Sequence, residues 1–189
     1  MSVVKTPWYS MLGDNPAKLD YSKLTMMEEV ERIAKQYPKY IAYDFLGTHT
    51  TYAALVRDIH AAAASLKAVG VKPNQRVTIC LPNTPMAITM FYAINMVGAI
   101  ANMIHPLSAE GEIEFYLNDS ESVAAITVDM FYSKFEKIRK NTPKLRTMIV
   151  TSIKDGLQPA MKVGYALTQG RKVPKLPKTQ DYLTWKQFL

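Results

Sequence analysis

The strongest constraint on the fold is the alternation of short apolar segments with helical ones in the middle of the chain. Four segments with the composition of β-strands begin about 23 residues apart, at residues 76–81, 100–104, 123–128 and 147–151. Segments with helical signals separate them, and strand–helix–strand connections of this kind place successive strands in parallel. The sequence therefore predicts an α/β fold, a Rossmann-like layered parallel sheet with flanking helices.

Capping residues mark where several helices begin. Thr25 and Glu28 have the spacing of a capping box, in which a hydroxyl and a carboxylate each accept a backbone hydrogen bond. Thr84 followed by Pro85 predicts the start of another helix, because proline fits the first helical turn. Ser108 is expected to cap the helix that follows the second of the four strands.

Composition divides the chain into three parts. Residues 1–23 contain prolines and a glycine in short succession and are expected to be an irregular lead-in. Residues 24–151 are expected to form the α/β subdomain. Residues 152–189 are expected to be a basic, proline-broken surface excursion followed by the start of a further segment.

One uncharged run has nearly the length of a membrane span. Met86–Ile104 is 19 residues long and holds no charged side chain. The strand–helix spacing divides this run into a helix and a strand, and a parallel sheet covered on both faces requires apolar strands. We therefore expect the run to be buried in the protein rather than inserted in a membrane.

The net charge of +7 is unevenly distributed. Residues 134–189 hold 13 basic and 3 acidic side chains, whereas residues 1–133 hold 10 basic and 13 acidic ones. A basic segment is typical of proteins that bind nucleic acid or anionic membranes, although a lysine-rich solvated surface explains the same composition. Because neither zinc-finger spacing nor aromatic–basic interleaving occurs, nucleic acid is not an expected partner.

The cysteine content bears on the cellular compartment. Cys80 is the single cysteine, which excludes an internal disulfide framework and any multi-cysteine zinc site. Since no secretory signal pattern opens the chain, a reducing, cytoplasmic location is expected. Cys80 falls within an apolar strand and is expected to be an inert core thiol.

Candidate site residues follow from the rule that ligands of an open parallel sheet gather at the carboxyl ends of its strands. Asn83, His105 and Pro106 follow two of these ends and are the candidate site-edge residues. His105 is expected to hold a loop rather than to act as an acid or base. No two glycines lie fewer than six positions apart, so the chain has no phosphate-binding loop, and no metal site is expected.

Five segments, in order, resemble the opening of the AMP-forming acyl-CoA synthetases. They lie between residues 51 and 120 and read Thr-Tyr-Ala-Ala-Leu, Gly-Val-Lys-Pro-Asn-Gln-Arg-Val, Leu-Pro-Asn-Thr-Pro, Gly-Ala-Ile-Ala-Asn-Met-Ile-His-Pro-Leu and Tyr-Leu-Asn-Asp-Ser. The chain thus resembles the amino-terminal part of the adenylate-forming (AMP-binding) superfamily, in its fatty-acid–CoA ligase branch. Amino-acid-activating members usually carry an aspartate where this chain has His105, which argues against an amino-acid substrate.

The resemblance implies an acid–thiol ligase that forms an acyl-adenylate from ATP and then transfers the acyl group to CoA. It implies ATP, Mg²⁺ and CoA as cofactors of the full-length enzyme. The family's Thr-Ser-Gly-Thr-Thr-Gly-x-Pro-Lys loop does not occur here, so the chain resembles a fragment truncated before the phosphate loop. We therefore expect no catalytic residue in this chain and no cofactor bound to it. Some relatives have an arginine that contacts CoA at the position of Leu107. Because leucine cannot make that contact, we do not assign a CoA-binding role to Leu107.

The resemblance also suggests partners. The remainder of the same polypeptide is the expected main partner, with a fatty acid and CoA as substrates of the full enzyme. Peripheral membrane contact and self-association of the isolated chain are further expectations. Two alternatives stay open: a stand-alone Rossmann-like binding module, and a basic surface-binding protein for nucleic acid or anionic membrane.

Overall fold

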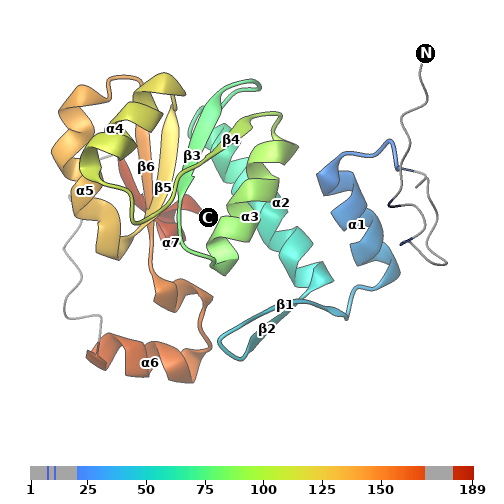
Figure 1. Ribbon diagram of the computed structural model, residues 1–189. Coiled ribbons are helices and arrows are strands. Elements are labelled where there is room, and N and C mark those ends of the chain that lie inside the picture. Colours follow the sequence, from blue (N-terminus) through green and yellow to red (C-terminus); the bar gives the residue numbers. More distant parts are fainter. Residues whose placement is uncertain (1–7, 9–10, 12–20, 169–180) are drawn as a thin grey trace, which may run out of the picture.

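The computed structural model describes residues 8, 11, 21–168 and 181–189 (Figure 1). Most of the expected lead-in and residues 169–180 of the expected excursion lie outside the described residues. The helices are α1 (Met26–Gln36), α2 (Tyr52–Ala68), α3 (Pro85–Met96), α4 (Glu110–Asp119), α5 (Tyr132–Ile138), α6 (Pro159–Thr168) and α7 (Trp185–Phe188). The strands are β1 (Ile41–Phe45), β2 (Thr48–Thr51), β3 (Arg76–Cys80), β4 (Ile100–Met103), β5 (Ala124–Val128), β6 (Thr147–Thr151) and β7 (Tyr182–Thr184).

The centre of the molecule is a five-stranded sheet in the order β4-β3-β5-β6-β7, in which every pair is parallel. The four strands expected from the sequence are its first four members, so the predicted α/β fold is confirmed. Strands β1 and β2 form a separate antiparallel hairpin. The chain goes from β3 to β4 on one side and then returns across β3 to β5, so the direction of strand addition reverses between β3 and β5.

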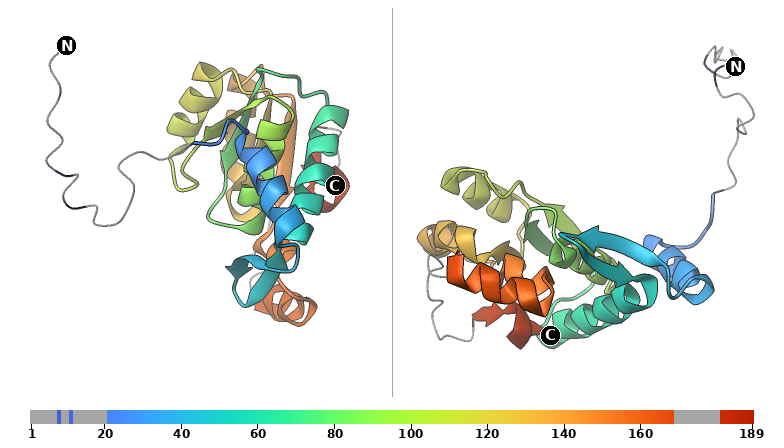
Figure 2. Two further views of the ribbon diagram at one scale, coloured as in Figure 1. Left: turned by 90° about the vertical axis from the view of Figure 1, so that its right-hand side faces the viewer. Right: turned by 90° about the horizontal axis from the view of Figure 1, so that it is seen from below.

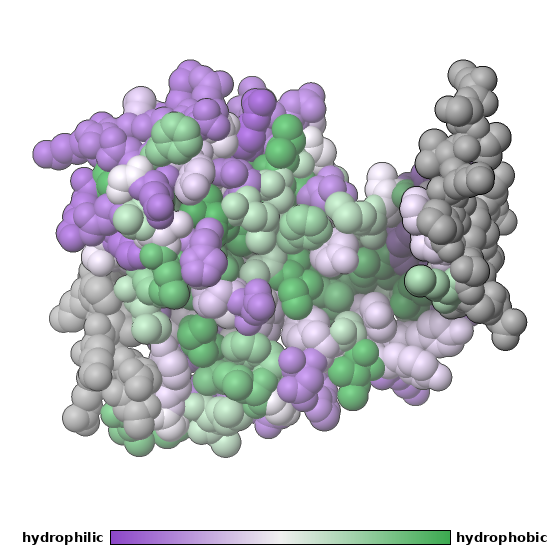
Figure 3. All heavy atoms as spheres, in the orientation of Figure 1, coloured by the Kyte–Doolittle hydropathy of each residue, from purple (hydrophilic) through white to green (hydrophobic). Residues whose placement is uncertain are grey.

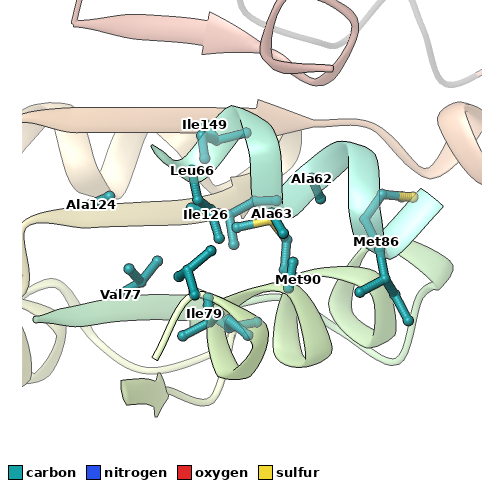
Figure 4. Close-up of a cluster of buried hydrophobic side chains, with 14 of the residues drawn as sticks. Ala62, Ala63, Leu66, Val77, Ile79, Met86, Met90, Ala124, Ile126 and Ile149 are labelled. Carbon is teal, nitrogen blue, oxygen red and sulfur yellow. The ribbon is translucent and has the colours of Figure 1, made fainter. Parts of the chain in front are cut away.

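The two faces of the sheet are covered by different helices (Figure 2). Val77, Ile79 and Ile126 pack with α2 and α3, and Figure 4 shows these side chains meeting those of the two helices. Cys80 and Ala125, the neighbours of Ile79 and Ile126 along their strands, join a second cluster with α4 and α5. Since successive residues of a strand point to opposite faces, the strands contribute to both clusters and need apolar residues at almost every position.

The uncharged run is divided as expected. Its first part is α3, and its second part contains β4 in the sheet. Met90, Ala93 and Ile94 of α3 are buried against the core, as expected. Ile100 and Met103 are 45% and 58% exposed because β4 is an edge strand, so the expected burial of this part of the run was wrong. Within the described residues, no helix combines the length and the apolar character needed to cross a bilayer.

Several local features differ from the sequence-based expectations. The N-cap of α4 is Ala109 rather than Ser108, so that expectation was wrong. The Ala109 amide donates to Glu112 Oε2 at 2.9 Å, whereas the Ser108 amide donates to the His105 carbonyl at 3.1 Å and closes the preceding turn. The sequence analysis also did not identify α6 or β7 as regular elements.

Strand β7 is held by a buried tyrosine. The Tyr182 hydroxyl donates to Glu136 Oε2 at 2.5 Å, and the Tyr132 hydroxyl donates to the same oxygen at 2.8 Å. Burial, together with the Glu136 carboxylate, raises the pKa of Tyr182 to about 12. This shared acceptor fastens the fifth strand to α5, which packs on one face of the sheet.

A buried polar network joins β3, β4 and the connection that precedes β5. Thr78 Oγ1 lies 2.7 Å from Ser122 Oγ and accepts a hydrogen bond from Asn102 Nδ2 at 2.9 Å. Ser120 Oγ lies 2.8 Å from Ser122 Oγ and accepts from the same Asn102 nitrogen at 3.1 Å. The network satisfies polar groups that would otherwise be costly to bury next to apolar side chains.

We predict that Thr78→Val lowers the free energy of unfolding by about 1–3 kcal/mol, because Ser122 and Asn102 lose a buried partner while the side-chain volume is kept. Urea unfolding followed by circular dichroism measures the change. Thr147→Val, at a half-exposed threonine of β6, is the matched control and should change stability by less than about 0.5 kcal/mol. Equal effects of the two substitutions would contradict the role assigned to the network.

Candidate functional site

The carboxyl ends of the sheet strands meet at one edge, where two grooves share Asn83 and Met103. The first, which we call the switch-point groove, has a volume of about 590 Å³ and is lined by Leu81, Pro82, Asn83, Met103, Ile104, His105, Pro106, Leu107, Val128, Met130, Phe131 and Ile153. The second, which we call the hairpin groove, has a volume of about 570 Å³ and is lined by Tyr43, Asp44, Phe45, Asn83, Thr84, Pro85, Ala87, Ile88, Phe91, Tyr92 and Met103.

The position of the switch-point groove follows from the order of the strands. The chain leaves β3 toward β4 on one side and continues with β5 on the other, so the loops after β3 and β5 diverge at this point. Ligands of open parallel sheets bind in the crevice that such a reversal creates. Asn83, His105 and Pro106, the three residues expected from the sequence, all line this groove. Their contact with a ligand stays a prediction.

The His105 side chain is part of the turn that follows β4. Its Nδ1 atom accepts a hydrogen bond from the Leu107 amide at 3.2 Å, which places the proton of the neutral ring on Nε2. The His105 carbonyl accepts from the Ser108 amide at 3.1 Å. The ring therefore bonds a loop amide, which agrees with the expected role in holding a loop, although a loop carbonyl was the expected kind of partner.

Cys80 lies at the end of β3 and is fully buried. Burial raises the pKa of its thiol to about 11, and the more distant charge of Lys134 and a hydrogen bond with Thr127 only partly oppose this shift. A thiol with this pKa is almost entirely protonated at neutral pH and is a poor nucleophile. The structure thus confirms that Cys80 is a buried core thiol.

Two polar residues are buried where β5 and β6 end. Asp129 is only 6% exposed, and its Oδ1 atom has no hydrogen-bond partner within the part of the chain that the structure describes. Ser152, just after β6, is 5% exposed, and both side chains act on the hydroxyl of Tyr165 in α6. Burial and the charge of Asp129 raise the pKa of the Tyr165 hydroxyl, while the Ser152 side chain acts in the opposite direction.

The hairpin groove is mainly apolar and aromatic. Phe91 and Tyr92 of α3 contact each other edge to face, with ring centroids 5.5 Å apart. The opposite wall is the β1–β2 hairpin with Phe45, which packs closely on Gly156: a Cβ atom at that glycine would lie 3.2 Å from the Phe45 ring. Figure 3 shows hydrophobic residues gathered around α3 and along the lower part of this face, below the polar surface of α4 and α5.

The chemistry available in the two grooves is limited. Neither is lined by a lysine or arginine, and residues 77–133 contain none. Within the described ranges, no group of three or more histidine, cysteine, aspartate or glutamate side chains could hold a metal ion. The grooves can therefore bind apolar groups and a few hydrogen-bonding ones, but they do not fit the phosphates of a nucleotide. The sequence analysis identified their polar rim but not their aromatic and methionine lining.

Comparisons with known proteins agree with the fold. The family model described as "AMP-binding enzyme" matches residues 30–183. A long-chain-fatty-acid–CoA ligase of Bacillus subtilis is 30% identical over 168 residues, which are 88% of this chain and 30% of that protein. An acetyl-coenzyme A synthetase of Methanothrix thermoacetophila is 31% identical over 152 residues, covering 71% of this chain and 23% of that protein. The chain thus spans less than a third of the length of these relatives.

A solved structure has the same fold. The anthranilate CoA ligase AuaEII, in complex with anthranoyl-AMP, superimposes on this chain with a TM-score of 0.64 and 23% sequence identity. The match covers 84% of this chain and 30% of that one. Because the sequence identity is only 23%, this match shows that the two proteins share the arrangement of helices and strands.

We predict that Cys80 resists alkylation in the folded chain. At pH 8 a thiol of pKa about 11 carries about 100-fold less thiolate than one with its ordinary pKa near 9, and burial blocks the reagent as well. Iodoacetamide labelling followed by mass spectrometry should show modification in 8 M urea and essentially none in buffer. Labelling at similar rates under both conditions would show that the thiol is accessible in the folded state.

Proposed function

This chain belongs to the AMP-binding enzyme family, and we propose that it is the amino-terminal part of an AMP-forming acyl-CoA ligase that acts on a fatty acid. The resemblance to the adenylate-forming superfamily and its fatty-acid–CoA ligase branch is confirmed. The observation that carries the proposal is the 30% identity to a long-chain-fatty-acid–CoA ligase across 88% of the chain. The chain is also similar to an acetyl-coenzyme A synthetase. The identity of the carboxylic acid substrate is therefore the part of the proposal that most needs a test.

The proposed reaction has two steps. A carboxylate attacks the α-phosphorus of ATP and releases pyrophosphate, and the thiol of CoA then displaces AMP to give the acyl-CoA. ATP, Mg²⁺ and CoA are cofactors and substrates of the whole enzyme in this proposal. Since the grooves of this chain lack cations and closely spaced glycines, we assign none of these steps to its residues.

The role we propose for this chain is to build the sheet on which the rest of the enzyme assembles. Met103, Leu107 and Met130 are large apolar residues that stay exposed around the switch-point groove. Exposed apolar side chains gathered at a concave edge are typical of surfaces that pack against another part of a protein. We propose that the remainder of the same polypeptide covers them, with residues 24–151 as the α/β subdomain of the complete AMP-binding domain.

The test compares the complete open reading frame with the 189-residue chain. We expect the complete protein to catalyse pyrophosphate exchange with palmitate or oleate more efficiently than with acetate or benzoate. We expect the 189-residue chain to catalyse no exchange and to show no ATP–Mg²⁺ binding in calorimetry. Micromolar ATP binding by this chain would contradict the proposal.

We predict that His105→Ala in the complete enzyme lowers the rate of the thioester-forming step by no more than about tenfold, because the ring supports a turn and general catalysts contribute about 10²–10⁴-fold. His105→Asn keeps a side-chain acceptor near the Leu107 amide and should restore part of the loss. Stopped assays at saturating substrates give the rates. His60→Ala, at an exposed histidine paired with Glu31, is the control. A loss above about 100-fold with an intact fold would assign His105 a chemical role.

A further inference from the structure

A further groove lies at the amino ends of the sheet strands, opposite the edge that holds the switch-point groove. It has a volume of about 340 Å³ and is lined by residues at or just before the starts of β3, β5 and β6, which lie side by side in Figure 1. We call it the amino-edge groove. Its charged lining residues are Arg76, Lys144, Arg146 and Glu121. Three cations against one carboxylate leave the lining with a net charge of +2.

The strand register brings the two arginines into one row. The Val123 amide donates to the Arg76 carbonyl at 2.9 Å, and the Arg146 amide donates to the Val123 carbonyl at 2.9 Å. Arg76 and Arg146 therefore flank Val123 across the sheet, with Cα atoms about 9.6 Å apart for two strand spacings of about 4.8 Å each. Two long side chains that start at this separation can close on one small ligand between them.

These two arginines differ from the others in lacking a carboxylate partner. Five of the six arginines of the sequence lie among the described residues. Three of them, Arg32, Arg57 and Arg139, each form an ion pair with a nearby carboxylate. Arg76 and Arg146 are exposed and form no ion pair within the described part of the chain. No described carboxylate therefore neutralises either guanidinium group.

Few of the hydrogen-bond donors in the groove are occupied by described neighbours. Gln75 Oε1 accepts a hydrogen bond from the Lys72 amide at 2.9 Å, and Arg146 Nη2 lies 3.5 Å from the same oxygen. This contact orients the Arg146 side chain and involves one of its five N–H groups. Lys144 Nζ lies 3.8 Å from Glu121 Oε1, and both side chains are exposed, so water screens this pair.

We propose that the amino-edge groove binds a phosphate dianion, either free phosphate or the phosphate group of a small monoester. The forked N–H groups of a guanidinium match two oxygens of a phosphate, and two such forks line this groove. A phosphomonoester carries a charge of about −1.5 to −2 near pH 7, which is complementary to the net charge of the lining, whereas a monocarboxylate carries a single charge. The volume is at the lower end of the range for small-molecule sites, about 300–1,000 Å³. This proposal is independent of the proposed ligase activity.

The test is a titration of the isotope-labelled 189-residue chain with inorganic phosphate, glycerol 3-phosphate or acetate at constant ionic strength, followed by amide chemical shifts in NMR spectra. With both phosphates we expect saturable shifts confined to residues 74–76, 121–123 and 143–146, with a Kd of about 1 mM. Acetate should give no saturable shift. Tighter binding of glycerol 3-phosphate would identify a monoester as the ligand, and equal or tighter binding of inorganic phosphate would identify the phosphate group alone.

Substitutions separate the groove from the net charge of the chain. Arg76→Gln and Arg146→Gln should each weaken phosphate binding about tenfold or more, because each removes one of the two charged forks. Arg57→Gln is the matched control, since it removes the same charge from an arginine that is paired with Asp58, and it should leave binding unchanged. Glu121→Gln removes the carboxylate of the groove and should strengthen binding about twofold.

Three results would overturn the proposal. The first is no saturable shift with either phosphate, or equal weakening by Arg57→Gln and Arg76→Gln, because net charge alone would then attract the anion. The second is acetate binding as tight as phosphate binding. The third is phosphate binding by the 189-residue chain that the complete protein lacks, because the remaining polypeptide would then cover the groove.

Folding of the variants is checked by circular dichroism. The substituted residues are exposed, so each variant should give the signal of the unsubstituted chain. If one arginine variant does not fold, the other arginine variant and Glu121→Gln carry the test. Pyrophosphate exchange measures the ligase proposal separately, so failure of one proposal leaves the other testable.

Discussion

The architecture depends on the burial of β5 on both of its faces. This strand is the middle member of the five-stranded sheet, and all five of its residues are buried. Ala124, Ile126 and Val128 face one cluster of helices, while Ala125 faces the other. A strand in this position requires a helical layer on each side, and parallel neighbours supply those layers because each crossover contributes a helix. The parallel order then brings the carboxyl ends of the strands together at one edge.

The same arrangement determines where ligands or other parts of a protein can bind. Because strand addition reverses between β3 and β5, the loops after them diverge and leave the switch-point groove with Asn83 and His105 on its rim. The groove has the position of a ligand site but lacks the cations and glycines that phosphates need. A sheet that presents this edge without a phosphate loop fits the proposed role as one part of a larger adenylate-forming enzyme.

The sequence predicted the elements whose signals are local. Regular spacing identified β3 to β6, and the capping box at Thr25 marked the start of α1, where the structure shows both hydrogen bonds. The cap at α4 was missed because the Glu112 carboxylate, rather than Ser108, accepts the N-terminal amide. Strand β7 has three residues, too few to show a period, and its position depends on the distant partner Glu136. The apolar lining of the two grooves likewise depends on tertiary contacts that no local pattern encodes.

Helix α6 shows why a hydrophobic pattern alone does not tell which side of a helix faces the core. In α6, Val163 and Leu167 are 62% and 64% exposed, whereas Tyr165 is partly buried. Other exposed apolar residues, among them Met103, Leu107 and Met130, line the concave switch-point groove, which no lysine or arginine lines. A concave uncharged surface suits a polypeptide or an acyl group, which agrees with the proposed assembly of this edge with the remainder of an adenylate-forming enzyme.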